Sequence, residues 1–110
     1  MSEVIKLKCV KARSLEEIAM DVKVELCSEL VCEEKVLNDK AVLLCLEEYY
    51  FRCSSYVALT VLLTENEDCQ EAIVAGFGGG DGISNISWGA NKSFARKAAN
   101  ALCKLGFEEV

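Results

Sequence analysis

The stretches AVLLCL at residues 41–46 and VALTVLL at residues 57–63 decide the fold. Both are rich in Val and Leu and contain neither Gly nor Pro, which is typical of β-strands. Successive side chains of a strand point to opposite sides, so each stretch carries apolar residues on both of its faces. A strand of that kind is usually central and covered on both sides. The sequence therefore predicts a central strand pair, joined through residues 47–56, whose two faces both need cover.

Four further regions predict strands around this pair. Residues 4–10 alternate apolar side chains with lysines, which indicates a half-buried strand near an edge of the sheet. Residues 70–78 predict another strand, and residues 83–88 predict a short one. Residues 30–37 are compatible with a short strand or with an extension of the preceding helix, and we prefer the strand.

Two helices are expected from apolar stripes at helical spacing. Ser14 and Glu17 fit a capping box at the start of the first helix, which should end near residues 27–28. The second helix should cover residues 91–105, and Gly106 suits a C-terminal cap in which the next residue folds back. The buried stripes should contain Leu15, Ile18, Ala19, Val22 and Leu26 in the first helix, and Phe94, Ala98, Ala101, Leu102 and Leu105 in the second.

The order of these elements is β-α-(β)-β-β-β-(β)-α, with the less certain strands in parentheses. Short connections make consecutive strands antiparallel neighbours. We therefore predict an α+β fold, in which an antiparallel sheet of four to six strands carries two helices on one face (a two-layer sandwich). Residues 1–110 should form a single domain, because a chain of this length suits one hydrophobic core.

Composition and charge restrict the class of protein. The chain is 52% hydrophobic, but its longest apolar run is far too short to cross a bilayer, and its start lacks a charged-then-apolar leader. We therefore expect a soluble cytoplasmic protein with no membrane partner. The net charge is −6, and residues 14–71 carry 14 acidic against four basic side chains. Because phosphate contacts dominate nucleic-acid affinity, no nucleic-acid partner is expected.

Catalytic and metal chemistry find little support in the sequence. The seven cysteines have Cys27-x4-Cys32 as their nearest spacing, and the chain contains no His, so we expect neither a metal site nor a cofactor. An odd number of cysteines without an export signal also argues against a disulfide framework. General acid–base catalysis lacks its commonest agent, and the adjacent Glu47 and Glu48 point to opposite faces of a strand. We therefore predict no catalytic residue, and Cys103 should be an exposed thiol.

The glycine-rich stretch GFGGGDG at residues 76–82 is the sharpest local motif. Its backbone amides could cradle a small anion, with Lys92 at the start of the second helix assisting. The stretch does not match GxGxxG, because Asp81 stands where the last Gly is needed, and it lacks the P-loop's Gly-Lys-Ser/Thr. We favour the alternative, a hairpin turn at Asp81-Gly82.

The polar residues that follow this stretch extend the ligand hypothesis. Their hydroxyl, amide and indole groups could serve a small-ligand pocket. We favour the alternative, a short strand whose polar groups meet water or cap the next helix. The complete candidate set for ligand binding is Gly78, Gly79, Gly80, Asp81, Gly82, Ser84, Asn85, Ser87, Trp88 and Lys92.

Two segments, SSYVALTVLLTE at residues 54–65 and GGGDGISNISWGA at residues 78–90, carry a resemblance to a known family. The chain resembles a small bacterial family of proteins of unknown function, and the similarity runs from about the first helix to Phe107. The resemblance implies a compact single-domain α+β protein and supplies no catalytic residue.

Two helical stripes cover only one side of a sheet of this size. The row formed by Val42, Leu44 and Leu46, together with Ala58 and Leu62, should then be left without cover. We expect a homodimer to bury it, either through this second sheet face or through an edge strand. The alternative is a sheet that curls until it closes on itself.

The function expected from these observations is a non-enzymatic binding or protein-interaction module that acts as a homodimer. The alternative is a small-anion or phosphometabolite site at the glycine-rich loop 76–90, which would allow an enzymatic role.

Overall fold

The computed structural model describes residues 2–27, 29–38, 40–50, 55–77 and 85–110. In chain order, the elements are β1 (Ser2–Val10), α1 (Leu15–Leu26), β2 (Glu29–Val36), β3 (Ala41–Tyr50), β4 (Ser55–Glu65), β5 (Cys69–Phe77), α2 (Asn85–Lys104) and β6 (Glu108–Glu109). The strands form one antiparallel sheet in the order β2-β3-β4-β5-β1-β6.

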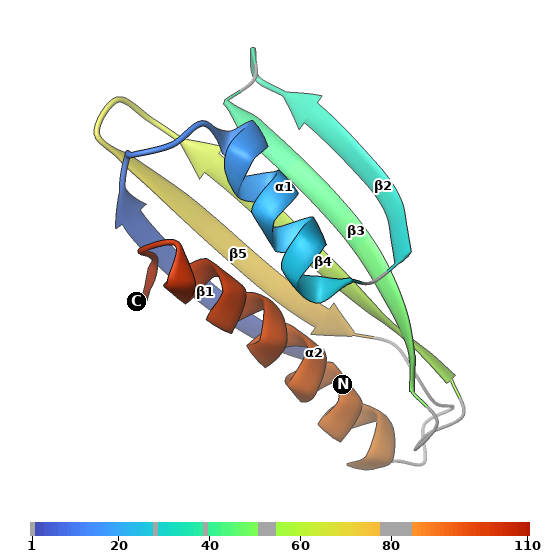
Figure 1. Ribbon diagram of the computed structural model, residues 1–110. Coiled ribbons are helices and arrows are strands. Elements are labelled where there is room, and N and C mark those ends of the chain that lie inside the picture. The colour runs from blue at the N-terminus through green and yellow to red at the C-terminus, as the bar shows by residue number, and fades with distance from the viewer. Residues whose placement is uncertain (1, 28, 39, 51–54, 78–84) are drawn as a thin grey trace.

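Both helices lie on the same side of this sheet (Figure 1). Helix α1 packs over β3 and β4, helix α2 packs over β1, β4 and β5, and the helices contact each other. The predicted α+β sandwich is therefore confirmed, with six strands at the upper end of the expected range. The strand preferred for the region between α1 and β3 is also confirmed, as β2.

Two predictions are wrong near the C-terminus: the short strand at residues 83–88 and the start of the second helix at residue 91. The backbone is helical from Asn85, so the short strand expected at residues 83–88 does not exist over residues 85–88. Once an Ala-rich helix has nucleated, each added turn costs little, so helix α2 extends back to Asn85 although this extension includes Gly89. The two-residue strand β6, which pairs with Leu7 and Lys8 of β1, gave no sequence signal.

The start of α1 and the end of α2 are capped as their sequences indicate. The Ser14 Oγ accepts a hydrogen bond from the Glu17 amide at 3.1 Å, which caps α1. After α2, the Phe107 amide donates to the Leu102 carbonyl at 3.2 Å and the Gly106 amide donates to the Cys103 carbonyl at 3.1 Å. Gly106 has φ of +104°, which only Gly adopts readily. This is a Schellman cap, and Phe107 is buried as expected.

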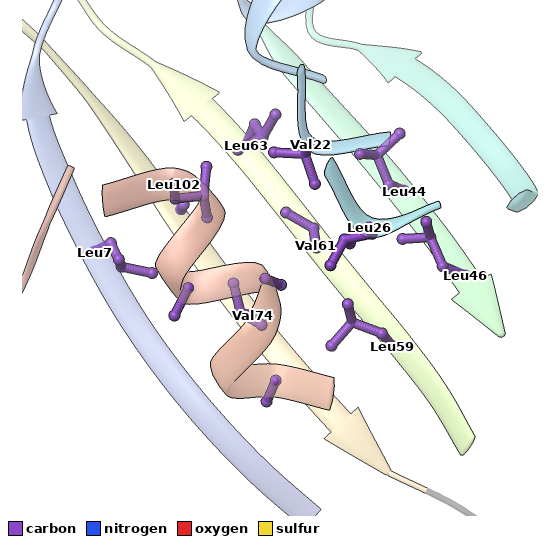
Figure 2. Close-up of a cluster of buried hydrophobic side chains, with 14 of the residues drawn as sticks. Leu7, Val22, Leu26, Leu44, Leu46, Leu59, Val61, Leu63, Val74 and Leu102 are labelled. Carbon is purple, nitrogen blue, oxygen red and sulfur yellow. The ribbon is translucent and has the colours of Figure 1, made fainter. Parts of the chain in front are cut away.

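The hydrophobic core fills the layer between the helices and one face of the sheet (Figure 2). The strand pair contributes two facing rows, because the pairing register places Val42 opposite Leu63, Leu44 opposite Val61 and Leu46 opposite Leu59. The stripes predicted for α1 and α2 are buried, except for Leu105, which is partly buried.

The prediction that one row of strand residues lacks cover is therefore wrong. That row was Val42, Leu44 and Leu46 together with Ala58 and Leu62. Val42, Leu44 and Leu46 are at most 1% exposed beneath the helices, whereas Ala58 and Leu62 lie on the opposite face. The register of the β3–β4 hairpin pairs even-numbered with odd-numbered residues, which brings the two most apolar rows together under the helices. The partners of Ala58 and Leu62 on the outer side are Glu47 and Leu43.

Candidate functional site

The glycine-rich ligand hypothesis falls mostly outside the described residues. The residues expected to supply the backbone cradle and the first hydroxyl group lie outside the described part of the chain. They are Gly78, Gly79, Gly80, Asp81, Gly82 and Ser84. Asn85, Ser87 and Trp88 belong to the first turns of α2, where the structure describes the backbone but not these side chains. Lys92 is an exposed residue of the same helix. The ligand hypothesis thus stays a prediction.

The most extensive candidate site in the described part of the chain is the sheet surface opposite the helices, which we call the open face. Side chains that alternate with the core rows lie on this face. Several are apolar and well exposed: Val4 at 53%, Ile73 at 40% and Phe77 at 42%. Because the helices and the core occupy the other face, the open face is the sheet surface available to a partner.

One cross-strand row of the open face runs from a base to an acid. The pairing registers align Lys6 of β1 with Ile73, then Leu62, then Leu43, and finally Glu34 of β2. The middle of the row is apolar, and its two charged ends lie on strands at opposite sides of the sheet. Within the described residues, the ion pairs of the chain include neither Lys6 nor Glu34.

The next row carries two thiols. It aligns Val4 with Ala75, Thr60, Cys45 and Cys32, so the two cysteines are direct cross-strand partners. Partial burial, the neighbouring Cys45 and Glu34, and a hydrogen bond with Cys45 raise the pKa of the Cys32 thiol. Both cysteines are free thiols and partly buried.

The open face also carries a pair of aromatic rings and a hollow. Tyr49 and Tyr56 pair across β3 and β4 in an edge-to-face arrangement, with ring centroids 5.2 Å apart. A hollow of about 240 Å³ lies near the β1 side, and its lining includes Lys6, Leu62 and Ile73. The face thus combines apolar area, aromatic rings and separated charges, which suits recognition of another protein surface.

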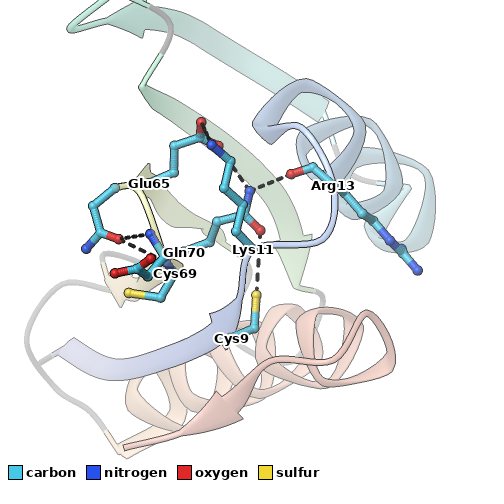
Figure 3. A network of polar contacts seen from close by, with 8 residues as sticks. Cys9, Lys11, Arg13, Glu65, Cys69 and Gln70 are labelled. Carbon is cyan, nitrogen blue, oxygen red and sulfur yellow. Dashed lines mark hydrogen bonds and ion pairs between the residues drawn. The ribbon is translucent and has the colours of Figure 1, made fainter.

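A second polar cluster surrounds Gln70 at the inner side of β5 (Figure 3). Gln70 is only 1% exposed, and its Nε2 donates to the Arg13 carbonyl at 2.5 Å and to Glu65 Oε1 at 3.1 Å. Its Oε1 accepts from the Cys9 thiol at 3.6 Å. Burial is the main cause that raises the pKa of Cys9. Every polar group of this amide has a partner, so the cluster fastens the β1–α1 loop to the β4–β5 hairpin.

Gln70→Leu is expected to lower the free energy of unfolding by about 1–3 kcal/mol, because the partly buried contacts of this amide lose their hydrogen bonds. Urea unfolding monitored by circular dichroism measures this loss. Lys8→Gln, an exposed change on neighbouring β1, should have little effect and serves as the control. An unchanged unfolding free energy for Gln70→Leu would contradict the structural role of the cluster.

The same variant should weaken the response of stability to acid. The hydrogen bond from Gln70, with the ion pair to Lys11, holds the pKa of Glu65 below its ordinary value, although partial burial opposes the shift. A lowered pKa in the folded state contributes stability at neutral pH that is lost as the pH falls below about 4.3 towards the folded-state pKa. Unfolding curves at neutral and acidic pH should therefore differ less for Gln70→Leu than for the wild-type protein.

The described residues contain neither a cluster suited to a metal ion nor a helix suited to span a membrane. Among residues 2–27, 29–38, 40–50, 55–77 and 85–110, no cluster of three or more Cys, Asp or Glu side chains is placed to hold a metal ion. Neither helix, over its described residues, has the combination of length and apolar composition that a membrane span requires.

Sequence reasoning missed the composition of the open face because it did not determine the hairpin register. One signal in the sequence indicates this register. The all-apolar row of residues 57–63 and the all-apolar row of β3 bury the most apolar surface when they lie on the same face. Cys103 is exposed, as predicted, and belongs to neither face of the sheet.

Comparison with known proteins identifies the family. Searches of the curated proteins and of the solved structures found no match. Residues 10–106 match DUF6054, which is described as a family of unknown function. This match covers most of the 110 residues and includes α1, α2 and the strands from β2 to β5. The chain therefore belongs to the DUF6054 family.

Proposed function

We propose that the protein is a non-enzymatic interaction module that acts as a homodimer, and that two open faces pack against each other. The observation that carries the proposal is the row from Lys6 to Glu34. A two-fold axis between the sheets and parallel to the strands reverses the left-to-right order of the strands. It therefore lays β1 of one protomer over β2 of its partner and β4 over β4.

This arrangement pairs opposite charges at both ends of the row. Lys6 of each protomer faces the partner's Glu34, while the apolar Ile73 faces the partner's Leu43. An axis perpendicular to the strands would instead place like charges over each other, because β1 would cover β1. Packed sheets are rotated by about 30°, and the long Lys and Glu side chains span the resulting offset.

The size of the open face suits a stable dimer. Five strands at a spacing of about 4.8 Å and nine residues at about 3.4 Å each give a face of about 24 by 30 Å. Two such faces bury roughly 1,400 Å², which lies within the usual range for specific protein complexes. The central rows contain the small residues Ala58, Thr60 and Ala75, which favour close approach of two sheets.

Sedimentation equilibrium over a range of protein concentrations tests the proposal. The expected result is a reversible transition from a 12.1 kDa monomer to a species of twice that mass. The highest concentration should be about 0.1 mM, which is about 100 times the Kd of a micromolar dimer. A mass of 12.1 kDa at every concentration up to this value would contradict the proposal. A dimer that forms through the edge strand β2 is separated from this proposal by the substitutions described in the Discussion.

A further inference from the structure

We propose that Cys32 and Cys45 form a reversible dithiol–disulfide site, which is oxidised by a small disulfide such as oxidised glutathione. The inference goes beyond the proposed dimer and does not depend on it. It rests on the geometry of two adjacent strands, because the two residues are direct antiparallel partners on β2 and β3.

The register places the sulfur atoms within reach of each other. Directly opposed residues of an antiparallel pair have Cα atoms about 4.5–5.5 Å apart, which falls within the range that a disulfide bridges. The pairing register shifts by one residue at a β-bulge between Leu30 and Cys32. As a result Cys32, and not Val31, stands opposite Cys45. The Cys45 thiol is also close enough to raise the pKa of the Cys32 thiol.

The other thiols of the described residues lack this arrangement. Cys9 and Cys69 lie on adjacent strands, but Cys9 is paired with Gln70 and Cys69 with Val10, so the two side chains point to opposite faces. Cys27 caps α1, where its thiol donates to the Val24 carbonyl at 3.0 Å. Location also favours Cys32, because β2 is an edge strand and a small oxidant can approach it from the side.

The reaction is an ordinary thiol–disulfide exchange. One of the two thiols loses its proton and attacks the small disulfide, which forms a mixed disulfide and releases one small thiolate. The second cysteine then loses its proton, and its thiolate attacks the protein sulfur of the mixed disulfide, which expels the second small thiolate. In total the protein loses two protons and two electrons, and the small disulfide is reduced to two thiols.

The experiment maps disulfides after exposure to oxidised glutathione at about pH 8, where more thiolate is present than at neutral pH. Remaining thiols are alkylated, and the protein is cleaved with trypsin. Cleavage after Lys23, Lys35, Lys40 and Arg52 gives peptides 24–35 and 41–52, which contain Cys32 and Cys45 respectively. The expected result is a species that joins these two peptides and is removed by dithiothreitol. Because peptide 24–35 also contains Cys27, the measurement is repeated in Cys27→Ser, where the linked species should persist.

Single substitutions supply the decisive comparison. Cys32→Ser and Cys45→Ser should each lose the linked species and instead accumulate a stable glutathione adduct at the remaining cysteine of the pair. Cys103→Ser, a change at an exposed thiol, should behave like the wild-type protein. Glutathione adducts on Cys32 and Cys45 of the wild-type protein without a link between the two peptides would overturn the proposal. So would a linked species that survives Cys32→Ser, because Cys27 would then form the link. Circular dichroism confirms that each variant is folded.

The rate of disulfide formation adds a readout that a merely structural cysteine would not give. Because the pKa of Cys32 is raised, only a small fraction is thiolate at neutral pH, and formation should accelerate steadily as the pH rises. A rate independent of pH would contradict exchange through these thiolates. The disulfide map does not require the dimer, so a failed dimer proposal and a failed dithiol proposal give distinguishable results.

Discussion

Leu62→Lys is expected to weaken the proposed dimer at least about 100-fold, with little effect on the folded protomer. Leu62 occupies the centre of the row on β4, so the two-fold axis places it against the same residue of the partner. Two ammonium groups would then meet in the middle of the interface. Such like-charge contacts cost several kcal/mol, and about 2.8 kcal/mol corresponds to a 100-fold change in Kd. In the free protomer the side chain is only partly buried, and lysine can extend its ammonium group into water.

Sedimentation velocity across a concentration series measures the change in Kd. Val24→Lys is the matched control, because Val24 is a 65% exposed apolar residue of α1 on the helical side of the protein. It should leave the dimer unchanged. Equal dissociation in both variants would indicate that the open face is not the interface, and so would no dissociation in either.

Phe94→Ala is expected to lower the free energy of unfolding by about 3–5 kcal/mol. Phe94 is completely buried on α2, beneath which β1, β4 and β5 pass. Truncation removes its apolar contacts and leaves a cavity that a close-packed core fills only in part. A loss of this size is a large fraction of the 5–15 kcal/mol that stabilises a typical domain, so the Tm should fall by roughly 15 °C or more.

Urea unfolding at one fixed protein concentration measures this effect, because a dimer makes apparent stability depend on concentration. Asn100→Ala changes an exposed residue of the same helix and should alter the unfolding free energy by less than about 0.5 kcal/mol. A loss below about 1 kcal/mol for Phe94→Ala would mean that α2 does not bury this side chain against the sheet.

Local sequence signals predicted the elements whose determinants are local. The cap at Ser14 and the apolar stripe of α1 depend only on neighbouring residues, and both are present. The same holds for Gly106, whose positive φ ends α2 in a Schellman cap. Amphipathic stripes also predicted that each helix packs on the sheet through one apolar face.

The open face could not be predicted in the same way. Both rows of β3 and β4 contain apolar residues, so periodicity alone does not say which row of one strand pairs with which row of the other. The pairing of Leu44 with Val61 rather than with Leu62 depends on the length and geometry of the connecting turn. The row that joins Lys6 to Glu34 crosses five strands and depends on four separate registers. Strand β6 depends on its pairing with β1, which the two residues of β6 do not signal by themselves.

A charge-reversal mixing experiment tests the central claim most directly. Lys6→Glu places two acids at each end of the homodimer row, and Glu34→Lys places two bases there. Two like-charge pairs at about 1 kcal/mol each should weaken each homodimer about 30-fold. An equimolar mixture of the two variants restores opposite charges at both ends, so sedimentation velocity should show a heterodimer about as stable as the wild-type dimer. Variants that each dimerise as tightly as the wild-type protein, or a mixture that stays as weakly associated as its components, would contradict the open-face dimer.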